Sequence, residues 1–166
     1  MRRKDREIVN TEEVFDILKR CETIRIGFHG EKYPYIVPVS FGVEMVSGTP
    51  VIYFHCARQG MKLDLLKANT HVCVEGDRFL KTETTDHGIT TRYESVIGFG
   101  DCMIVADHDE IFHGLRLLTE HYGYSDYPLE RCRGLEHLFV GKITINEITG
   151  KRNLPGQTVA AVQENT

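Results

Sequence analysis

The sequence predicts a mainly β protein of the α+β class, a six-stranded antiparallel β-barrel with flanking helices. Six short segments have strand patterns, most of them joined by hairpin-sized turns, and three further segments have helical spacing. A chain of 166 residues buries about 70% of its unfolded surface, so its core needs no disulfide or metal. Short antiparallel strands in this number commonly close on themselves, because closure removes unpaired edges.

The chain begins with a predicted helix over 11–20, followed by a strand. Asn10 and Glu13 form a capping-box pattern, and apolar residues then recur at helical spacing. Over 23–28 the period changes to two, which predicts a strand. Residues 29–32 (HGEK) have the composition of a hairpin turn.

The next predicted strand, over 34–44, has two unequal rows of side chains. The large apolar row consists of Tyr35, Val37, Val39, Phe41 and Val43. The opposite row is mostly small and consists of Ile36, Pro38, Ser40 and Gly42. Because proline removes a donor from the ladder, Pro38 marks an edge, a bulge or a place where something other than a strand lies alongside. One interpretation is a simple edge strand, and the other is a low shelf for a flat ligand.

A strand, a helix and a second strand follow. Residues 51–55 are an apolar run that predicts a buried strand, 56–60 interrupt it, and 61–68 form a short helix. Residues 71–76 alternate again and predict a strand. The next stretch, 77–90, is polar, and we expect it to be a long loop or a frayed hairpin.

The C-terminal half contains a long strand, a helix and a last strand. Residues 92–105 predict a strand whose glycines allow it to bend as barrel strands do. A second capping box opens a helix over 107–122, and 138–148 form the last strand. We therefore expect a single domain over 1–152 and a flexible C-terminal tail over 153–166.

Charge and cysteine content argue against several functions. Four basic residues stand in the first six positions, which leaves 16 basic and 23 acidic residues in the rest of the chain. An acidic body argues against a nucleic-acid partner. The five cysteines include no CxxC pair, and no apolar run approaches the length of a membrane span or signal peptide, so we expect no membrane association and a cytoplasmic protein with reduced thiols. His108, His113 and His121 lack the spacing of a helical metal pair, so no metal site is expected.

The segment 55–62 combines a strand end, a glycine-containing turn and a helix N-terminus. Free backbone N–H groups and the helix dipole favour an anion at such a place. His55, Arg58 and Lys62 add three cationic or donor side chains, which suit a phosphate better than a carboxylate. The alternative is an ordinary helix start whose charges lie in water. A phosphate site near a low shelf for a planar group suggests flavin mononucleotide.

Three longer segments resemble one known family. They are Pro34–Phe41 (PYIVPVSF), Tyr53–Leu66 (YFHCARQGMKLDLL) and Tyr93–Gly100 (YESVIGFG). Together with both ends of the region 1–152, they resemble the nitroimidazole-resistance (Nim) family of the pyridoxamine 5′-phosphate oxidase-like, FMN-binding split barrels. The chain departs from that family at Cys56, where a small hydroxyl residue is expected, and at Met61, where a basic residue often precedes the lysine.

The resemblance implies a homodimer with two flavins at the subunit interface, FMN being the expected cofactor and FAD a possible one. It implies that 55–62 hold the phosphate, that 37–41 lie beside the flavin ring and that 95–98 line the same cleft. The implied cofactor-binding residues are Val37, Pro38, Val39, Ser40, Phe41, His55, Cys56, Arg58, Lys62, Ser95 and Val96. His55 is the candidate catalytic residue, since the corresponding family histidine lies near the redox site; its alternative role is a hydrogen bond to a backbone carbonyl.

The expected activity is flavin-dependent reduction of small, flat nitroaromatic compounds such as 5-nitroimidazoles. Pyridoxamine-phosphate oxidation is an alternative within the enzyme class, although no second phosphate site is evident. A flavin- or haem-binding protein without turnover is an alternative from another class, and a barrel used only for dimerisation is the simplest one.

Overall fold

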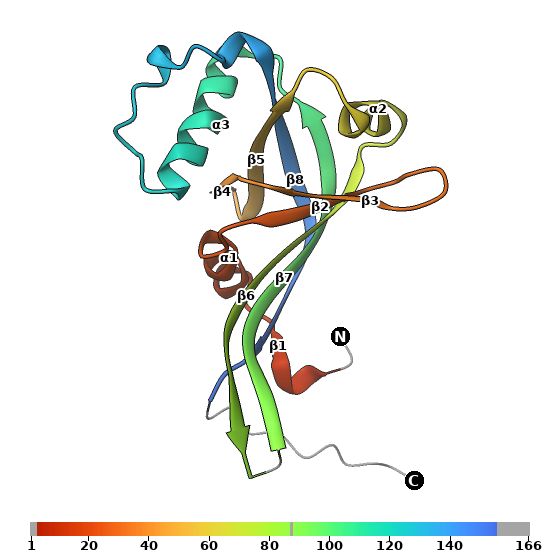
Figure 1. The fold of residues 1–166 in the computed structure, drawn as a ribbon, viewed down its shortest axis with the longest axis vertical. Coiled ribbons are helices and arrows are strands. Elements are labelled where there is room, and N and C mark those ends of the chain that lie inside the picture. The colour runs from red at the N-terminus through yellow and green to blue at the C-terminus, as the bar shows by residue number, and fades with distance from the viewer. Residues whose placement is uncertain (1–2, 87, 156–166) are drawn as a thin grey trace.

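The computed structural model describes residues 3–86 and 88–155, and these form one curved antiparallel sheet with helices around it (Figure 1). The strands are β1 (Glu7–Ile8), β2 (Ile24–Phe28), β3 (Tyr35–Val39), β4 (Gly42–Val46), β5 (Thr49–Ala57), β6 (His71–Thr85), β7 (Gly88–Ile104) and β8 (Leu138–Asn153). The helices are α1 (Thr11–Lys19), α2 (Met61–Ala68) and α3 (His108–His121), with short 3₁₀ turns at Lys4–Arg6, Leu129–Arg131 and Leu135–His137. No helix of the described residues is long and apolar enough to cross a membrane.

The strand order is β3-β2-β6-β7-β8-β5-β4, with β1 paired to β8, and every pair is antiparallel. The two edge strands of this order, β3 and β4, are consecutive in the chain and are separated only by Ser40 and Phe41. The two edges of the curled sheet are therefore connected by the chain itself, through Ser40 and Phe41, and not by hydrogen bonds between β3 and β4. This is a split barrel, and the predicted mainly β fold with flanking helices is confirmed.

The predicted number of six strands is wrong, because the described residues contain eight. The segment 34–44 is two strands: Val39 pairs with Ile24 at one edge of the sheet, and Gly42 pairs with Tyr53 at the other. Pro38 lies in β3, an edge strand that pairs only with β2, which is where a sheet tolerates a proline. The other strand that was not predicted is β1. It has only two residues, too few to produce a periodic pattern.

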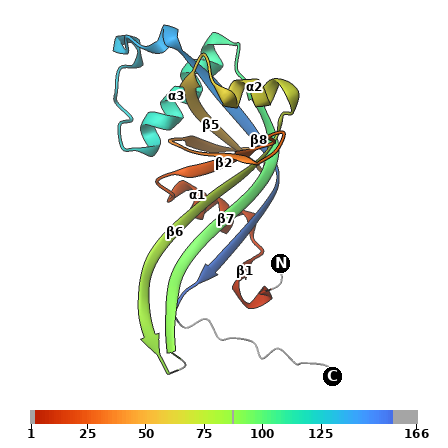
Figure 2. The same cartoon turned by 45° about the vertical axis from the view of Figure 1, so that its right-hand side comes forward.

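Residues 77–90, predicted as a loop or frayed hairpin, belong to a long arm formed by β6 and β7, which is two-stranded beyond the end of β8. Strands β6 and β7 remain paired from His71 and Asp101 to Thr85 and Gly88, and the arm extends far beyond the barrel (Figures 1 and 2). Most of its side chains reach solvent, so the apolar alternation that would have identified these strands is missing. The arm carries cross-strand ion pairs, such as that between Glu83 and Arg92 at 2.5 Å.

The C-terminal strand is also longer than predicted. Strand β8 continues to Asn153, the residue at which the flexible tail was expected to begin. The Asn153 side chain is buried and donates to the carbonyl of Thr91 at 2.6 Å. The part of the predicted tail over 156–166 lies outside the described residues.

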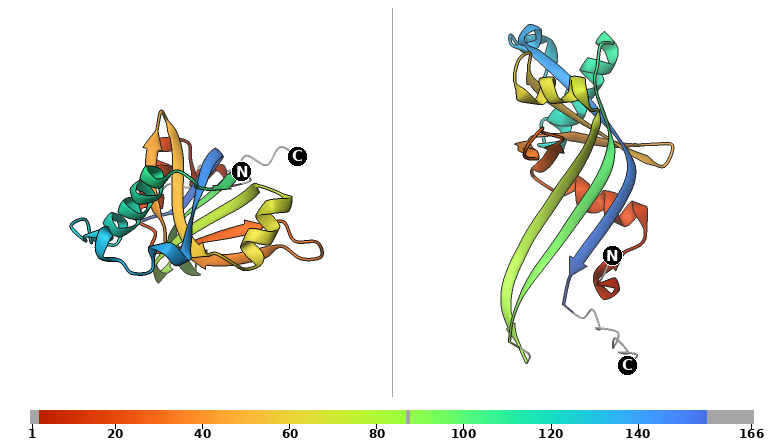
Figure 3. Two further views of the ribbon diagram at one scale, coloured as in Figure 1. Left: turned by 90° about the horizontal axis from the view of Figure 1, so that it is seen from above. Right: turned by 90° about the vertical axis from the view of Figure 1, so that its right-hand side faces the viewer.

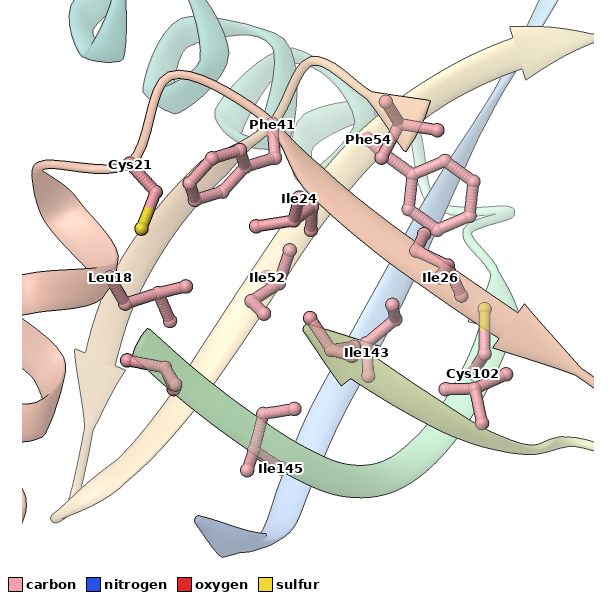
Figure 4. Packing of buried hydrophobic residues seen from close by; sticks show 14 of the residues in the cluster. Leu18, Cys21, Ile24, Ile26, Phe41, Ile52, Phe54, Cys102, Ile143 and Ile145 are labelled. Atoms are coloured by element: carbon pink, nitrogen blue, oxygen red, sulfur yellow. The ribbon is translucent and has the colours of Figure 1, made fainter. Parts of the chain in front are cut away.

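The barrel interior holds the main core, and α3 covers a second apolar cluster. The most deeply buried interior side chains include Ile24, Phe41, Ile52, Phe54 and Ile143, which come from β2, β5, β8 and the connection between β3 and β4 (Figure 4). On the outer face of β5, Val51 and Tyr53 pack against Leu115 of α3. Seen from above, α2 and α3 lie on opposite sides of the barrel (Figure 3).

Candidate functional site

The loop between β5 and α2 forms an uncapped helix start. Gly60 precedes the helix with φ +133°, a conformation that side chains rarely adopt, and within the described residues no side chain caps this end. The amides of Leu63 and Asp64 both donate to the carbonyl of Gly60, at 3.0 and 3.3 Å. The amides before them have no partner within the helix and point outward, where the dipole is positive. This geometry favours an anion.

Three side chains with donors surround this helix start. His55 is exposed near the end of β5, Arg58 is exposed in the loop, and Lys62 is half-buried in the first turn of α2. The pKa of His55 is lowered, first by desolvation and then by the positive charge of Lys62, so the ring is neutral at pH 7. The Arg58 guanidinium lies 5.1 Å from the centroid of the Phe139 ring. We call residues 55–62 the anion loop.

Cys56 points away from this loop. Its side chain is buried in the barrel core, and burial raises the pKa of the thiol. Only the backbone of Cys56 can therefore contact a ligand on the outer surface. A cysteine in place of a hydroxyl residue at this position changes the core and not the surface of the loop.

Only some of the residues predicted to lie beside a flavin ring face outward from β3 and the turn after it. Val39 and Phe41 are buried in the barrel core, whereas Pro38 and Ser40 are exposed. Val37 is half-buried against the same core. The Phe41 amide donates to the hydroxyl of Tyr122 at 3.3 Å, so this amide already has a partner.

The outward row of β3 leads toward the anion loop. Ser40 and Phe41 directly precede Gly42, whose partner in β5 is Tyr53, two residues before His55. Tyr53 and His55 occupy the same face of β5, the outer one. The shelf and the anion loop are therefore neighbouring parts of the outer surface.

Ser95 and Val96 are not brought to this place within one chain. Val96 is 2% exposed in the barrel core, and the Ser95 hydroxyl donates to the carbonyl of Lys151 at 3.5 Å. Both lie on β7, eight or nine residues before Ile104. Ile104 pairs with Gly141 of β8, and Gly141 pairs with Phe54 of β5, which directly precedes the anion loop. At roughly 3.3 Å per residue, this places them about 25 Å away along the strand.

Sequence reasoning did not identify an apolar hollow beside the anion loop. The hollow has a volume of about 710 Å³ and lies between α2 and the ends of β7 and β8. Its lining includes Arg58, Gly60, Leu63, Met103 and Phe139. Met103 and Phe139 come from distant strands, and only their apolar character at predicted surface positions could have signalled the hollow. No group of three or more His, Cys, Asp or Glu side chains in the described parts of the chain could hold a metal ion.

Fold and loop together define a split-barrel protein with a candidate anion site at the end of a strand. The family model for pyridoxamine 5′-phosphate oxidase matches residues 10–152, and the chain belongs to this family. No curated protein matches the sequence.

Several solved structures share the fold. One is a candidate 5-nitroimidazole antibiotic resistance protein from Bacteroides thetaiotaomicron VPI-5482, with 23% identity, a TM-score of 0.77 and coverage of 88% of this chain and 86% of the other. An FAD- and haem-binding protein from Mycobacterium smegmatis has 16% identity, a TM-score of 0.74 and coverage of 89% and 73%. An FAD-binding protein from Mesorhizobium loti has 18% identity, a TM-score of 0.63 and coverage of 88% and 96%. At these identities, the similarity shows the shared fold.

Proposed function

We propose that this protein binds a flavin and acts as a flavin-dependent reductase of small nitroaromatic compounds. The observation that carries the proposal is the uncapped helix start at Gly60, flanked by Arg58 and Lys62 and adjoining the shelf on β3. Membership of the pyridoxamine 5′-phosphate oxidase family supports it, as does a fold shared with FAD-binding proteins and with a candidate nitroimidazole-resistance protein.

The residues fit a flavin at two points. A phosphate needs several donors around three oxygens, and the anion loop offers the first amides of α2 together with the Lys62 ammonium. A planar ring needs a surface without tall side chains, and the exposed Pro38 and Ser40 provide one. When bound, the flavin supplies electron or hydride transfer.

The chain contributes position, electrostatics and a hydrogen-bond donor to this chemistry. Lys62 and the helix start fix the phosphate end, which sets where the ring lies on the shelf. The neutral His55 ring has one N–H and one acceptor nitrogen, so it can donate a hydrogen bond to a substrate oxygen near the shelf. A small, flat, electron-poor substrate is the class that stacks on such a ring.

We also propose that the active unit is a homodimer with the flavins at the interface. Exposed apolar side chains on the outer sheet face and on the arm support it, and these are Ile36, Phe79, Ile89, Ile97 and Phe99. A second copy of the chain covering this face would exclude water from the shelf. The second copy would also supply its own Ser95 to the cleft of the first. Within one chain, Ser95 lies about 25 Å from that cleft.

The test begins with the absorbance spectrum of the purified protein and a titration of the apo form with FMN by calorimetry. Lys62→Ala should weaken FMN binding by about tenfold to a hundredfold, because a hydrogen bond to a charged group contributes about 1.5–3 kcal/mol. The matched control is Lys67→Ala, which removes an exposed lysine of the same helix whose ammonium pairs with Asp64 at 3.1 Å. A colourless protein that binds no added flavin would refute the proposal.

Turnover separates the enzyme from a carrier. The flavin-loaded protein is reduced anaerobically and mixed with a 5-nitroimidazole, and in a separate assay the oxidised flavin-loaded protein is mixed with pyridoxamine 5′-phosphate under oxygen. Reoxidation by the nitro compound, slowed in His55→Ala but not in the Lys67→Ala control, is the expected result. Oxidation of pyridoxamine 5′-phosphate without any nitroimidazole reduction would overturn the proposed substrate class.

A further inference from the structure

The hollow beside the anion loop is not used by a flavin mononucleotide held as described above. It is bounded by residues of α2 and by the ends of β7 and β8. Its volume of about 710 Å³ lies within the range of about 300–1,000 Å³ typical of small-molecule sites. Its apolar lining consists of Leu63, Leu66, Met103, Ile104 and Phe139.

The hollow and the anion loop share a wall. Arg58, Gln59 and Gly60 line the hollow and are also the residues that lead into the helix start. An anion bound at the helix start therefore lies at the mouth of the hollow.

The two cationic side chains of the anion loop, Arg58 and Lys62, differ in their position relative to the hollow. Arg58 lines the hollow, whereas Lys62 is not among its lining residues. One phosphate at the helix start needs only Lys62 and the backbone amides. A diphosphate extending toward the hollow would use both Lys62 and Arg58, and the group attached to its second phosphate would enter the hollow.

The lining suits a purine nucleoside. The half-buried Phe139 ring and the planar guanidinium of Arg58, 5.1 Å from its centroid, offer surfaces on which a base can stack. The flexible Met103 side chain, which is 56% exposed, can cover the other side of a flat group. Asp64 and Thr70 at the rim can hydrogen-bond to ribose hydroxyls or an exocyclic amine.

From this arrangement we infer that the hollow binds the adenosine half of a flavin dinucleotide, so that FAD is preferred to FMN. The inference rests on the proposed flavin binding at the anion loop. It adds Arg58, Met103 and Phe139 to the residues that determine which flavin is bound.

The experiment compares FMN and FAD binding to the apo protein by calorimetry. Wild type should bind FAD about tenfold more tightly than FMN. Met103→Glu places a negative charge in the hollow and removes the apolar side chain that would cover one side of the base. It should weaken FAD binding by about tenfold and change FMN binding by less than about twofold. The matched control is Val46→Glu, which also introduces a glutamate, but at an exposed residue outside the hollow. It should leave both affinities unchanged.

The possible results distinguish this inference from the proposed function. Equal affinities for FMN and FAD in the wild type would overturn the inference and leave flavin binding intact. Equal weakening of both flavins by Met103→Glu, or conversion of a dimer to a monomer by this variant, would assign the hollow to another role and also overturn it. Failure of both flavins to bind would refute the proposed function itself, and the inference with it.

Discussion

The buried carboxylate of Glu94 joins helix α1 to the base of the arm, and its removal should destabilise the fold. Glu94 is 4% exposed, and it accepts hydrogen bonds from Arg20 at 2.8 and 3.1 Å and from Arg78 at 2.8 Å. Glutamine has the same size, but it replaces one acceptor oxygen with an NH₂ group that faces a guanidinium. The variant Glu94→Gln therefore leaves at least one of these donors without its acceptor.

The expected cost follows from the burial of the groups. Removing one partner of a buried ion pair costs about 3–5 kcal/mol. The side chains of Arg20 and Arg78 are 48% and 31% exposed, so water solvates part of the charge that the variant leaves unpaired. We therefore expect Glu94→Gln to cost about 2–3 kcal/mol, which for a chain of this length lowers Tm by about 4–12 °C.

Unfolding in urea, followed by circular dichroism, measures this cost without adding salt that would screen the ion pairs. The matched control is Glu83→Gln on the arm, where the carboxylate pairs with Lys81 and Arg92. The Glu83 carboxylate is more exposed, so its loss should cost less than the loss of the Glu94 carboxylate. If Glu94→Gln costs no more than Glu83→Gln, burial does not strengthen the Glu94 pairing and the reasoning is wrong.

Three further predictions concern the site and the core. Desolvation and the Lys62 charge lower the pKa of His55, so a bound phosphate dianion should raise it and FMN should bind more tightly as the pH falls toward about 6. Titration of the His55 ring by NMR with and without FMN measures this, and an unchanged pKa would contradict it. A methyl group at Gly141 would overlap the Phe54 ring, so Gly141→Ala should cost about 1–3 kcal/mol in urea unfolding, and adding Phe54→Leu should recover part of the loss. Burial raises the pKa of Cys102 to about 12, so iodoacetamide at about pH 8 should label this thiol only in the unfolded chain, and labelling of the native protein, detected by mass spectrometry, would be the contrary result.

The parts of the fold that depend on local signals could be predicted from the sequence. The Asn10 side chain accepts from the amides of Glu12 and Glu13, and Asp107 accepts from the amide of Glu110, as the two capping patterns predict. These interactions involve residues two or three positions apart, so the order of residues is enough to reveal them.

The parts that depend on distant partners could not be predicted. The break at Ser40–Phe41 arises because β3 pairs with β2 and β4 with β5, and nothing within 34–44 specifies this change of partner. The arm is held by pairing between β6 and β7 with polar side chains on both faces, so it lacks the hydrophobic pattern of a half-buried strand.

The candidate site likewise contains residues whose grouping could be predicted from the sequence and residues whose grouping could not. His55, Arg58 and Lys62 lie within eight consecutive residues, so their grouping follows from a strand end and a helix start that the sequence predicts. Met103 and Phe139 join them only through the strand order, which places the ends of β7 and β8 beside α2.

The position of β8 also determines when the barrel can be completed during synthesis. Among the described strands, β8 is the last to be synthesised, yet it lies between β7 and β5 and pairs with both. Until it emerges, the nascent chain exposes the unpaired edges of β7 and β5, which are free to pair with other chains. The barrel therefore cannot be completed before β8 has been synthesised, because both β7 and β5 depend on it for a pairing partner.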